Sequence, residues 1–264
     1  MNKAEQSIDK LKTNGNMNDT IINNLHIIRK RIENACIKSN RHPDEVKLLL
    51  ATKTVSANRI LIALKSGNTL IAENKIQELK EKYEVLMDTP HINHFIGHLQ
   101  TNKIKDVLKY DVACIHSLDR LDLAVKLQQR LEFENKTMEV LIQVNTSNEE
   151  SKFGVSPDKV VELVQQVSQL DRLKIKGLMT IGLFSADVEE IRPCFRLLRA
   201  IQEEIISFNV LNVEMKELSM GMSGDLETAI EEGATIVRVG SAVFGQRNYP
   251  DSYYWNEEKA SGGD

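Results

Sequence analysis

From residue 46 onward, short apolar runs alternate with longer stretches in which apolar residues recur every three or four positions. The short runs predict buried strands, and the longer stretches predict amphipathic helices. Eight strands are expected, near residues 46–52, 69–72, 91–96, 112–116, 138–144, 173–179, 215–219 and 235–239. Ahead of them, an apolar stripe at helical spacing predicts an N-terminal helix; its members are Ile21, Leu25, Ile28, Ile32 and Ala35.

The repeated strand–helix unit predicts the fold class. Strands that are apolar on both faces are typical of a parallel sheet covered by helices. Eight units within about 220 residues match a closed barrel of ordinary size. We therefore expect an α/β protein, a single (β/α)8 TIM barrel with an additional N-terminal helix. The alternative is an open doubly wound sheet, but its G-x-G-x-x-G fingerprint does not follow the first strand. The expected boundaries are a flexible N-terminal segment over 1–17, the barrel over 18–248 and a polar C-terminal tail over 249–264.

Composition excludes several classes of partner. The chain has 264 residues, with 34 Lys and Arg against 38 Asp and Glu, so its net charge is −4. This weak acidity argues against a nucleic-acid partner, and no apolar run approaches the roughly 20 residues that span a membrane. Cys36, Cys114 and Cys194 are too scattered for a disulfide framework or a zinc site. Together with an N-terminus that lacks a secretory signal pattern, they predict a cytoplasmic protein.

Lys53 is the first candidate for chemistry. It closes the first apolar run, and the functional site of such a barrel lies at the carboxyl ends of the strands. Partial burial there would favour the neutral amine, which is the form that attacks an aldehyde. The alternative is a lysine that extends from the strand end into water.

Two glycine-containing turns follow the seventh and eighth strands. The first, LSMGMSGD over 218–225, contains Ser219 and Met220, and the second contains Gly240 and Ser241. Glycines let the backbone approach a ligand, and free helix amides and hydroxyls bind phosphate. Phosphate sites in barrels of this kind are often built by these two loops. The alternative is a pair of tight turns that bind no ligand.

Arg238 and Asn74 are further candidates at the same end of the predicted barrel. A guanidinium within a barrel strand needs either a carboxylate or a ligand as its partner, and both remain open. Asn74 follows the second strand, where it either contacts a ligand or caps the next helix.

Three closely spaced histidines, His91, His94 and His98, suggest a metal site at first sight. Strand alternation directs His91 and His94 to opposite faces, and no nearby carboxylate completes a ligand set. We therefore expect no metal.

Together these features resemble the fold-type III pyridoxal phosphate (PLP) proteins. Within that class the chain resembles the pyridoxal phosphate homeostasis family, which is related to the N-terminal barrel of alanine racemase. The resemblance runs from about residue 18 to residue 247. The segments that carry it are LLLATKT (48–54), IAENKIQE (71–78), HFIGHLQTNK (94–103), IHSLDRL (115–121), VNTSNEESKFGV (144–155), KGLMTI (176–181), LSMGMSGDLETAI (218–230) and VRVGSAVFGQR (237–247).

The resemblance implies a role for each candidate. Lys53 resembles the lysine that forms the internal aldimine with PLP, and Asn74 resembles a residue beside the cofactor. Arg238 resembles the arginine that faces the pyridine nitrogen, where a cation disfavours ring protonation and weakens the electron sink of carbanion chemistry. The implied phosphate anchors are Ser219, Gly240 and Ser241, with Met220 alongside.

The function that the resemblance implies is intracellular PLP homeostasis without robust turnover. PLP-dependent apoenzymes are the possible recipients, and the protein is expected to be a monomer or a weak dimer. A PLP-dependent amino-acid racemase is the main alternative. Racemases of this fold take a second acid/base tyrosine from a separate domain, whereas here only a short tail with Tyr249, Tyr253, Tyr254 and Trp255 follows the barrel. A lysine-dependent aldolase of a sugar phosphate is a third hypothesis, for which no acid/base partner of Lys53 is identified.

Overall fold

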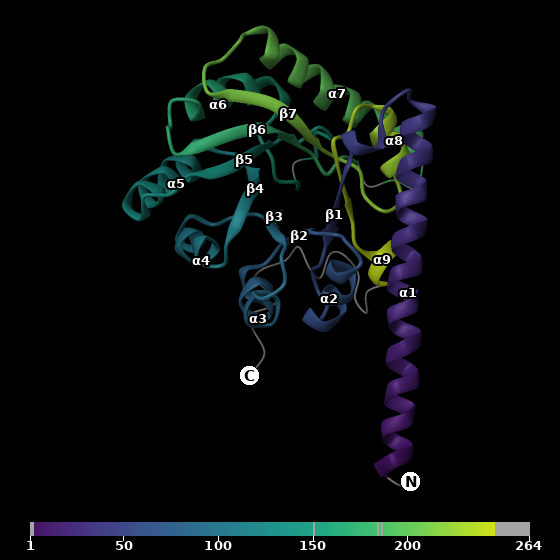
Figure 1. The fold of residues 1–264 in the computed structure, drawn as a ribbon. Coiled ribbons are helices and arrows are strands. Elements are labelled where there is room, and N and C mark those ends of the chain that lie inside the picture. Colours follow the sequence, from purple (N-terminus) through teal and green to yellow (C-terminus); the bar gives the residue numbers. More distant parts are fainter. Residues whose placement is uncertain (1–2, 150, 184, 186, 246–264) are drawn as a thin grey trace.

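The computed structural model describes residues 3–149, 151–183, 185 and 187–245, with side chains from residue 18 onward. Eight parallel strands follow one another in sequence order and close into a barrel surrounded by helices (Figure 1). All eight predicted strands and the (β/α)8 barrel are confirmed. The strands are β1 (Lys47–Ala51), β2 (Leu70–Glu73), β3 (Ile92–Phe95), β4 (Val112–Leu118), β5 (Met138–Gln143), β6 (Leu173–Met179), β7 (Val213–Ser219) and β8 (Ile236–Val239).

Helices follow the strands and cover the outside of the barrel. They are α1 (Lys3–Lys38), α2 (Ala57–Lys65), α3 (Ile76–Leu86), α4 (Ile104–Lys109), α5 (Leu121–Glu134), α6 (Val160–Val167), α7 (Val188–Ser207), α8 (Leu226–Glu231) and α9 (Ser241–Phe244). Short 3-10 turns occupy Pro43–Glu45, Thr101–Lys103 and Pro157–Lys159. Within the described part of the chain, no helix combines the length and the hydropathy that a membrane crossing requires.

Two apolar regions result from the alternation of side chains along the strands. The larger one lies between the strands and the surrounding helices. The smaller one fills the inside of the barrel; its buried members are Leu49, Ala72, Cys114, Leu141, Met179 and Ile236. Polar residues of the strands are also buried, among them His116, Ser219 and Arg238.

Barrel closure between β1 and β8 sets the geometry of that end. Leu49 pairs with Arg238 and Leu50 with Val239 in parallel register. Lys53 lies two residues beyond the end of β1, and Gly240 directly follows β8. Closure therefore brings the predicted lysine beside the predicted arginine and the glycine turn that follows it.

Helix α1 packs along one side of the barrel against α2, α8 and α9. The predicted apolar stripe of this helix is buried, as expected. The helix starts at Lys3, well before the predicted boundary near residue 18, so the segment expected to be flexible is helical over residues 3–17. Figure 1 shows this N-terminal half extending beyond the body of the barrel. Its flexibility stays a prediction, and the expected tail over 249–264 lies outside the described residues.

Two adjacent isoleucines of α1 test whether this helix is part of the folded unit. Ile28 is 1% exposed and Ile27 is 51% exposed. We expect Ile28→Ala to lower the free energy of unfolding by about 2–4 kcal/mol, because it leaves a cavity in the core. Ile27→Ala, the matched control, should change it by less than about 0.5 kcal/mol. Urea unfolding followed by circular dichroism measures both, and equal values would contradict the packing of α1.

Candidate functional site

A cavity of about 340 Å³ opens at the carboxyl ends of the strands. It is lined from β1, β6 and β8, from the loops that follow β1, β3, β6, β7 and β8, and from the start of α7. Its polar lining comprises Lys53, Ser185, Ser223, Asp225, Arg238 and Ser241, together with the glycines Gly224 and Gly240. Its apolar lining includes Ile96, Met179, Ile181, Leu183, Val188 and Ile191.

Lys53 is half-buried, and backbone contacts hold the residues on both sides of it. Thr52 donates its N–H to the Ala72 carbonyl at 2.9 Å, which continues the β1–β2 pairing. Thr54 has a positive φ of 65°, an uncommon conformation for a β-branched residue. Its N–H donates to both carboxylate oxygens of Glu78 at 3.2 Å. These contacts fix the direction in which the Lys53 side chain leaves the strand.

A buried ion pair supports this turn from behind. Glu73 Oε1 accepts from the Thr52 hydroxyl at 2.5 Å and from Lys82 Nζ at 2.7 Å. Lys82 also donates to the Thr52 carbonyl at 2.9 Å and pairs with Glu78. Burial raises the pKa of Glu73 to about 7, against the opposing effect of Lys82. The carboxylates and Lys82 thus tie β1, β2 and α3 together directly beneath Lys53.

The turn after β7 requires glycine at one position. Gly221 has a φ of 87°, and a side chain there would collide with Ala229 of α8. Its carbonyl accepts the Arg238 N–H at 2.9 Å, which attaches the turn to β8. The buried carboxylate of Asp225 accepts the Met222 N–H and closes the loop. The loop therefore presents Ser223 and Gly224 to the cavity from a fixed frame.

Arg238 lies at the base of the cavity and is 6% exposed. One terminal nitrogen donates to Ser219 Oγ at 3.0 Å and the other to the Thr180 carbonyl at 2.8 Å. Burial lowers its pKa to about 10, and the nearby Asp225 carboxylate opposes that effect. Within the described ranges, no carboxylate lies within ion-pairing distance of Arg238. Of the two partners that the sequence left open, a structural carboxylate pair is therefore not the one observed.

The predicted site residues divide into two groups. Lys53, Arg238, Gly240 and Ser241 line one cavity. Ser219 and Met220 are completely buried and Asn74 is nearly so, and none of the three lines it.

The structure places Ser219 differently from the expectation of a phosphate anchor. Its Oγ is engaged with Arg238 and with His116 inside the barrel, because side chains alternate along β7. Ser223 and Ser241 are the hydroxyl residues of the two glycine turns that line the cavity. Asn74 does not cap α3 either: Lys75 is the N-cap residue.

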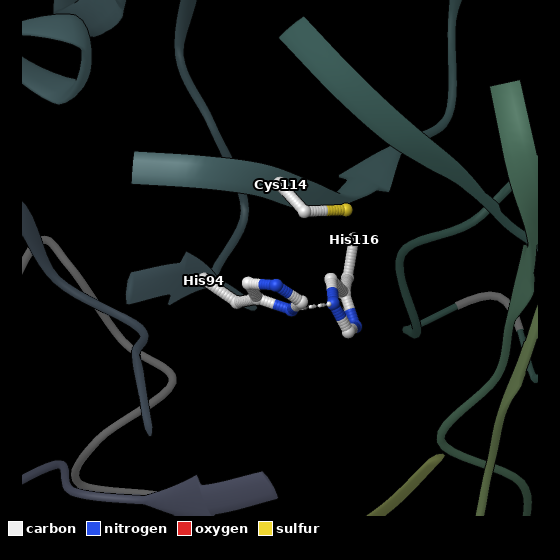
Figure 2. Close-up of side chains that lie close together, drawn as sticks. All are labelled: His94, Cys114 and His116. Atoms are coloured by element: carbon white, nitrogen blue, oxygen red, sulfur yellow. Dashed lines mark hydrogen bonds between the residues drawn. The ribbon is translucent and has the colours of Figure 1, made fainter. Parts of the chain in front are cut away.

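The three histidines of the sequence analysis do not converge. His91 Nδ1 lies 2.6 Å from the Thr89 carbonyl, and His98 stacks on Phe153 with ring centroids 4.0 Å apart. His94 instead lies beside His116 and Cys114 of the neighbouring strand β4 (Figure 2).

Sequence reasoning missed the apolar wall that Leu183, Val188 and Ile191 contribute from the β6–α7 loop and α7. No motif marks that segment. His116 was also missed, because its relation to Ser219 spans 103 positions of the chain. Only the barrel register brings those two residues together.

Fold and site together define a class of protein. The alanine racemase N-terminal domain family matches residues 20–248. Solved alanine racemases, such as that of Clostridium difficile, share the fold with a TM-score of 0.67 but are only 13% identical over 88% of this chain and 58% of theirs.

Comparison with curated relatives identifies a particular family within this class. A pyridoxal phosphate homeostasis protein of Aquifex aeolicus is 45% identical over 85% of this chain and 97% of its own length. The corresponding protein of Escherichia coli K12 is 37% identical over 88% of this chain and 99% of its own. The chain belongs to the pyridoxal phosphate homeostasis protein family.

Among solved structures, a protein of Bifidobacterium adolescentis described as unknown has a TM-score of 0.81 at 37% identity, over 86% of this chain and 96% of that one. PipY of Synechococcus elongatus, solved with PLP bound, has a TM-score of 0.74 at 29% identity, over 85% of this chain and 100% of that one.

Protonation of the buried histidines provides a direct test of the site's geometry. Desolvation, together with the nearby charge of Lys47, lowers the pKa of His94 from 6.5 to about 4. We expect ring-nitrogen NMR of the protein to show a neutral His94 at pH 6, with a midpoint near 4. Between pH 6.5 and 4 the unfolded chain binds more protons at this residue, so the free energy of unfolding should fall as the pH falls. A midpoint above 6 would contradict the burial of this pair.

Proposed function

We propose that this chain binds pyridoxal 5′-phosphate in the cavity at the carboxyl end of the barrel and serves in PLP homeostasis without robust turnover. One observation carries the proposal: Lys53, just after β1, and Arg238, in the adjacent strand β8, line the same cavity. When bound, PLP supplies an aldehyde with which a lysine amine can condense. Lys53 is the lysine of the cavity lining, so we assign that role to it.

The cavity suits the rest of the cofactor as well. Its volume of about 340 Å³ is within the range of small-molecule sites. Ser223, Gly224, Gly240 and Ser241 lie on the two loops that hold phosphate in many barrels of this type. We assign phosphate binding to the hydroxyls and backbone amides of these loops. Ile96, Ile181 and Ile191 contribute apolar surface to the same cavity.

Arg238 is the third feature of the cavity that suits PLP, after Lys53 and the two glycine-containing loops. A buried guanidinium has five N–H donors, and Ser219 and Thr180 use one on each terminal nitrogen. Donors that remain on the cavity side are matched by an acceptor such as a pyridine nitrogen. A cation at that position disfavours protonation of the ring and thereby weakens its capacity to stabilise a carbanion. This supports retention of the cofactor over turnover of amino acids.

We base the proposed cellular role on the names of the related proteins. Proteins that are 35–45% identical to this chain are named for PLP homeostasis, and PipY has been solved with PLP bound. We propose that the protein acts in the cytoplasm as a monomer or weak dimer and that PLP-dependent apoenzymes receive the cofactor from it. The three described cysteines are buried and unpaired, in keeping with a reducing compartment.

Borohydride reduction followed by peptide mapping tests the role of Lys53. We expect the wild-type protein incubated with PLP to be yellow and to carry the reduced cofactor on Lys53. Lys53→Ala should abolish the colour after dialysis and the adduct, with an unchanged circular dichroism spectrum. Lys152→Ala is the matched control, since Lys152 also lies in a loop that follows a strand but does not line the cavity. A major adduct on any other lysine would refute the assignment.

Exchange of the α-proton tests the proposed lack of turnover. With PLP bound, we expect L- and D-alanine in deuterium oxide to show neither racemisation nor exchange at robust enzymatic rates, on the order of 1 per second or faster. Proton NMR and chiral chromatography measure the two processes. Racemisation at such rates, abolished by Lys53→Ala, would favour the racemase alternative.

A further inference from the structure

A line of hydrogen bonds leads from Arg238 into the interior of the barrel. Arg238 donates to Ser219 Oγ at 3.0 Å, and this oxygen lies 3.0 Å from His116 Nδ1. His116 Nε2 in turn lies 2.7 Å from His94 Nδ1 (Figure 2). The four side chains come from β8, β7, β4 and β3, so they connect strands on different sides of the barrel. We call His94, His116 and Ser219 the interior chain.

The hydrogen bonds of the interior chain are all satisfied when each group donates to the next in the order Arg238, Ser219, His116, His94. Arg238 can only donate, so Ser219 Oγ accepts from it and directs its own proton to His116 Nδ1. The remaining proton of a neutral His116 is then on Nε2, from which it donates to His94 Nδ1. The opposite direction would leave the Ser219 hydroxyl proton without an acceptor in the described part of the chain. The network therefore assigns the Nε2–H tautomer to both histidines.

Both imidazoles are neutral in this arrangement. His116 is fully buried, and desolvation holds its pKa well below the ordinary value, with His94 and Arg238 acting in the same direction. A charged His116 would place a second cation beside Arg238 in a medium of low dielectric constant. Neutral histidines thus orient Arg238 through Ser219 without opposing its charge.

The same region offers an apparent metal site, which the geometry disfavours. Ligand atoms of His94, Cys114 and His116 all lie within 4.8 Å of one another. Two nitrogens bound to one tetrahedral zinc ion are separated by roughly 3.3 Å, but here they are 2.7 Å apart and share a hydrogen bond. A divalent ion would also add charge beside Arg238. The lone pairs of His94 Nδ1 and His116 Nδ1 already accept hydrogen bonds within the interior chain.

We propose that His94, His116 and Ser219 are positioning residues that fix the Arg238 guanidinium and thereby select a ligand whose ring carries an unprotonated nitrogen acceptor. The inference rests on the proposed function, because it assigns specificity within the same site. With one terminal nitrogen tied to Ser219 and the other to the Thr180 carbonyl, the plane of the guanidinium is fixed. The donors that face the cavity then have a defined direction, and a ring that presents C–H in place of nitrogen leaves them unpaired.

The test compares PLP with the analogue in which C–H replaces the ring nitrogen. Dissociation constants are measured for the wild type and for Ser219→Ala, His116→Leu and His116→Asn. The asparagine variant retains an acceptor close to the position of Nδ1 and serves as the rescue. Cys114→Ala is the matched control, because Cys114 is a neighbour of both histidines that takes no part in the interior chain.

We expect the wild type to prefer PLP over the analogue. Ser219→Ala and His116→Leu should lose about tenfold in PLP affinity, a typical effect of one hydrogen bond to a charged group. They should bind the analogue almost as the wild type does, so that the preference falls by a similar factor. Cys114→Ala and His116→Asn should retain the preference within about twofold. A purely structural role would weaken both ligands equally.

Three outcomes would overturn the inference. The first is an unchanged preference in Ser219→Ala and in His116→Leu, each with an intact thermal transition. The second is equal weakening of PLP and its analogue. The third is stoichiometric zinc binding by the protein that Cys114→Ala abolishes. In each case a borohydride-trapped adduct on Lys53 of the wild type would leave the proposed function standing, whereas failure of the wild type to bind PLP would overturn the function itself.

Discussion

A positive charge inside a closed barrel is the constraint on which the rest of this structure depends. Arg238 sits in β8, with helices covering the outside of the strand and packed side chains on the inside. Removing a guanidinium from water costs several kcal/mol unless its donors are satisfied. Here the Ser219 hydroxyl and the Thr180 carbonyl each accept one of these donors, and Asp225 is the nearby negative charge. The barrel therefore devotes part of its interior to polar side chains that a purely apolar core would not need.

The same constraint organises the mouth of the barrel. Arg238 lines the cavity at the carboxyl end of the barrel, where Lys53 follows β1 and the two glycine turns contribute hydroxyls and amides. Each of these parts has its own rigid support. Glu73, Lys82 and Glu78 hold the turn around Lys53, and Asp225 holds the loop after β7. Function is placed on loops, but the precision of the site comes from strands and buried polar contacts.

Periodicity was sufficient to predict the eight strands, because each buried strand is a short apolar run bounded by polar residues. Strand order and the rule that barrel sites lie at the carboxyl ends then indicated Lys53, Arg238, Gly240 and Ser241. Side-chain direction was beyond the sequence. Ser219 was expected to anchor a phosphate, and its Oγ contacts Arg238 and His116; the sequence did not indicate the contact with His116, which comes from a strand far away in the chain. The full length of α1 was missed because residues 3–17 lack the apolar stripe that marks residues 21–35.

The balance of charge around Arg238 connects this interior to the choice between retention and catalysis. Carbanion chemistry on a pyridine ring benefits from a protonated ring nitrogen, and a neighbouring cation opposes that protonation. The opposition persists only while Arg238 keeps both its charge and its direction. Its pKa of about 10 keeps the charge at neutral pH, and neutral histidines keep the direction without adding a repelling charge. A carboxylate in place of Ser219 would neutralise the guanidinium and remove that opposition. The Ser219 hydroxyl, hydrogen-bonded to neutral imidazoles, accepts from Arg238 and leaves the charge of Arg238 facing the cavity. This is the electrostatic basis on which we propose retention of PLP over its activation.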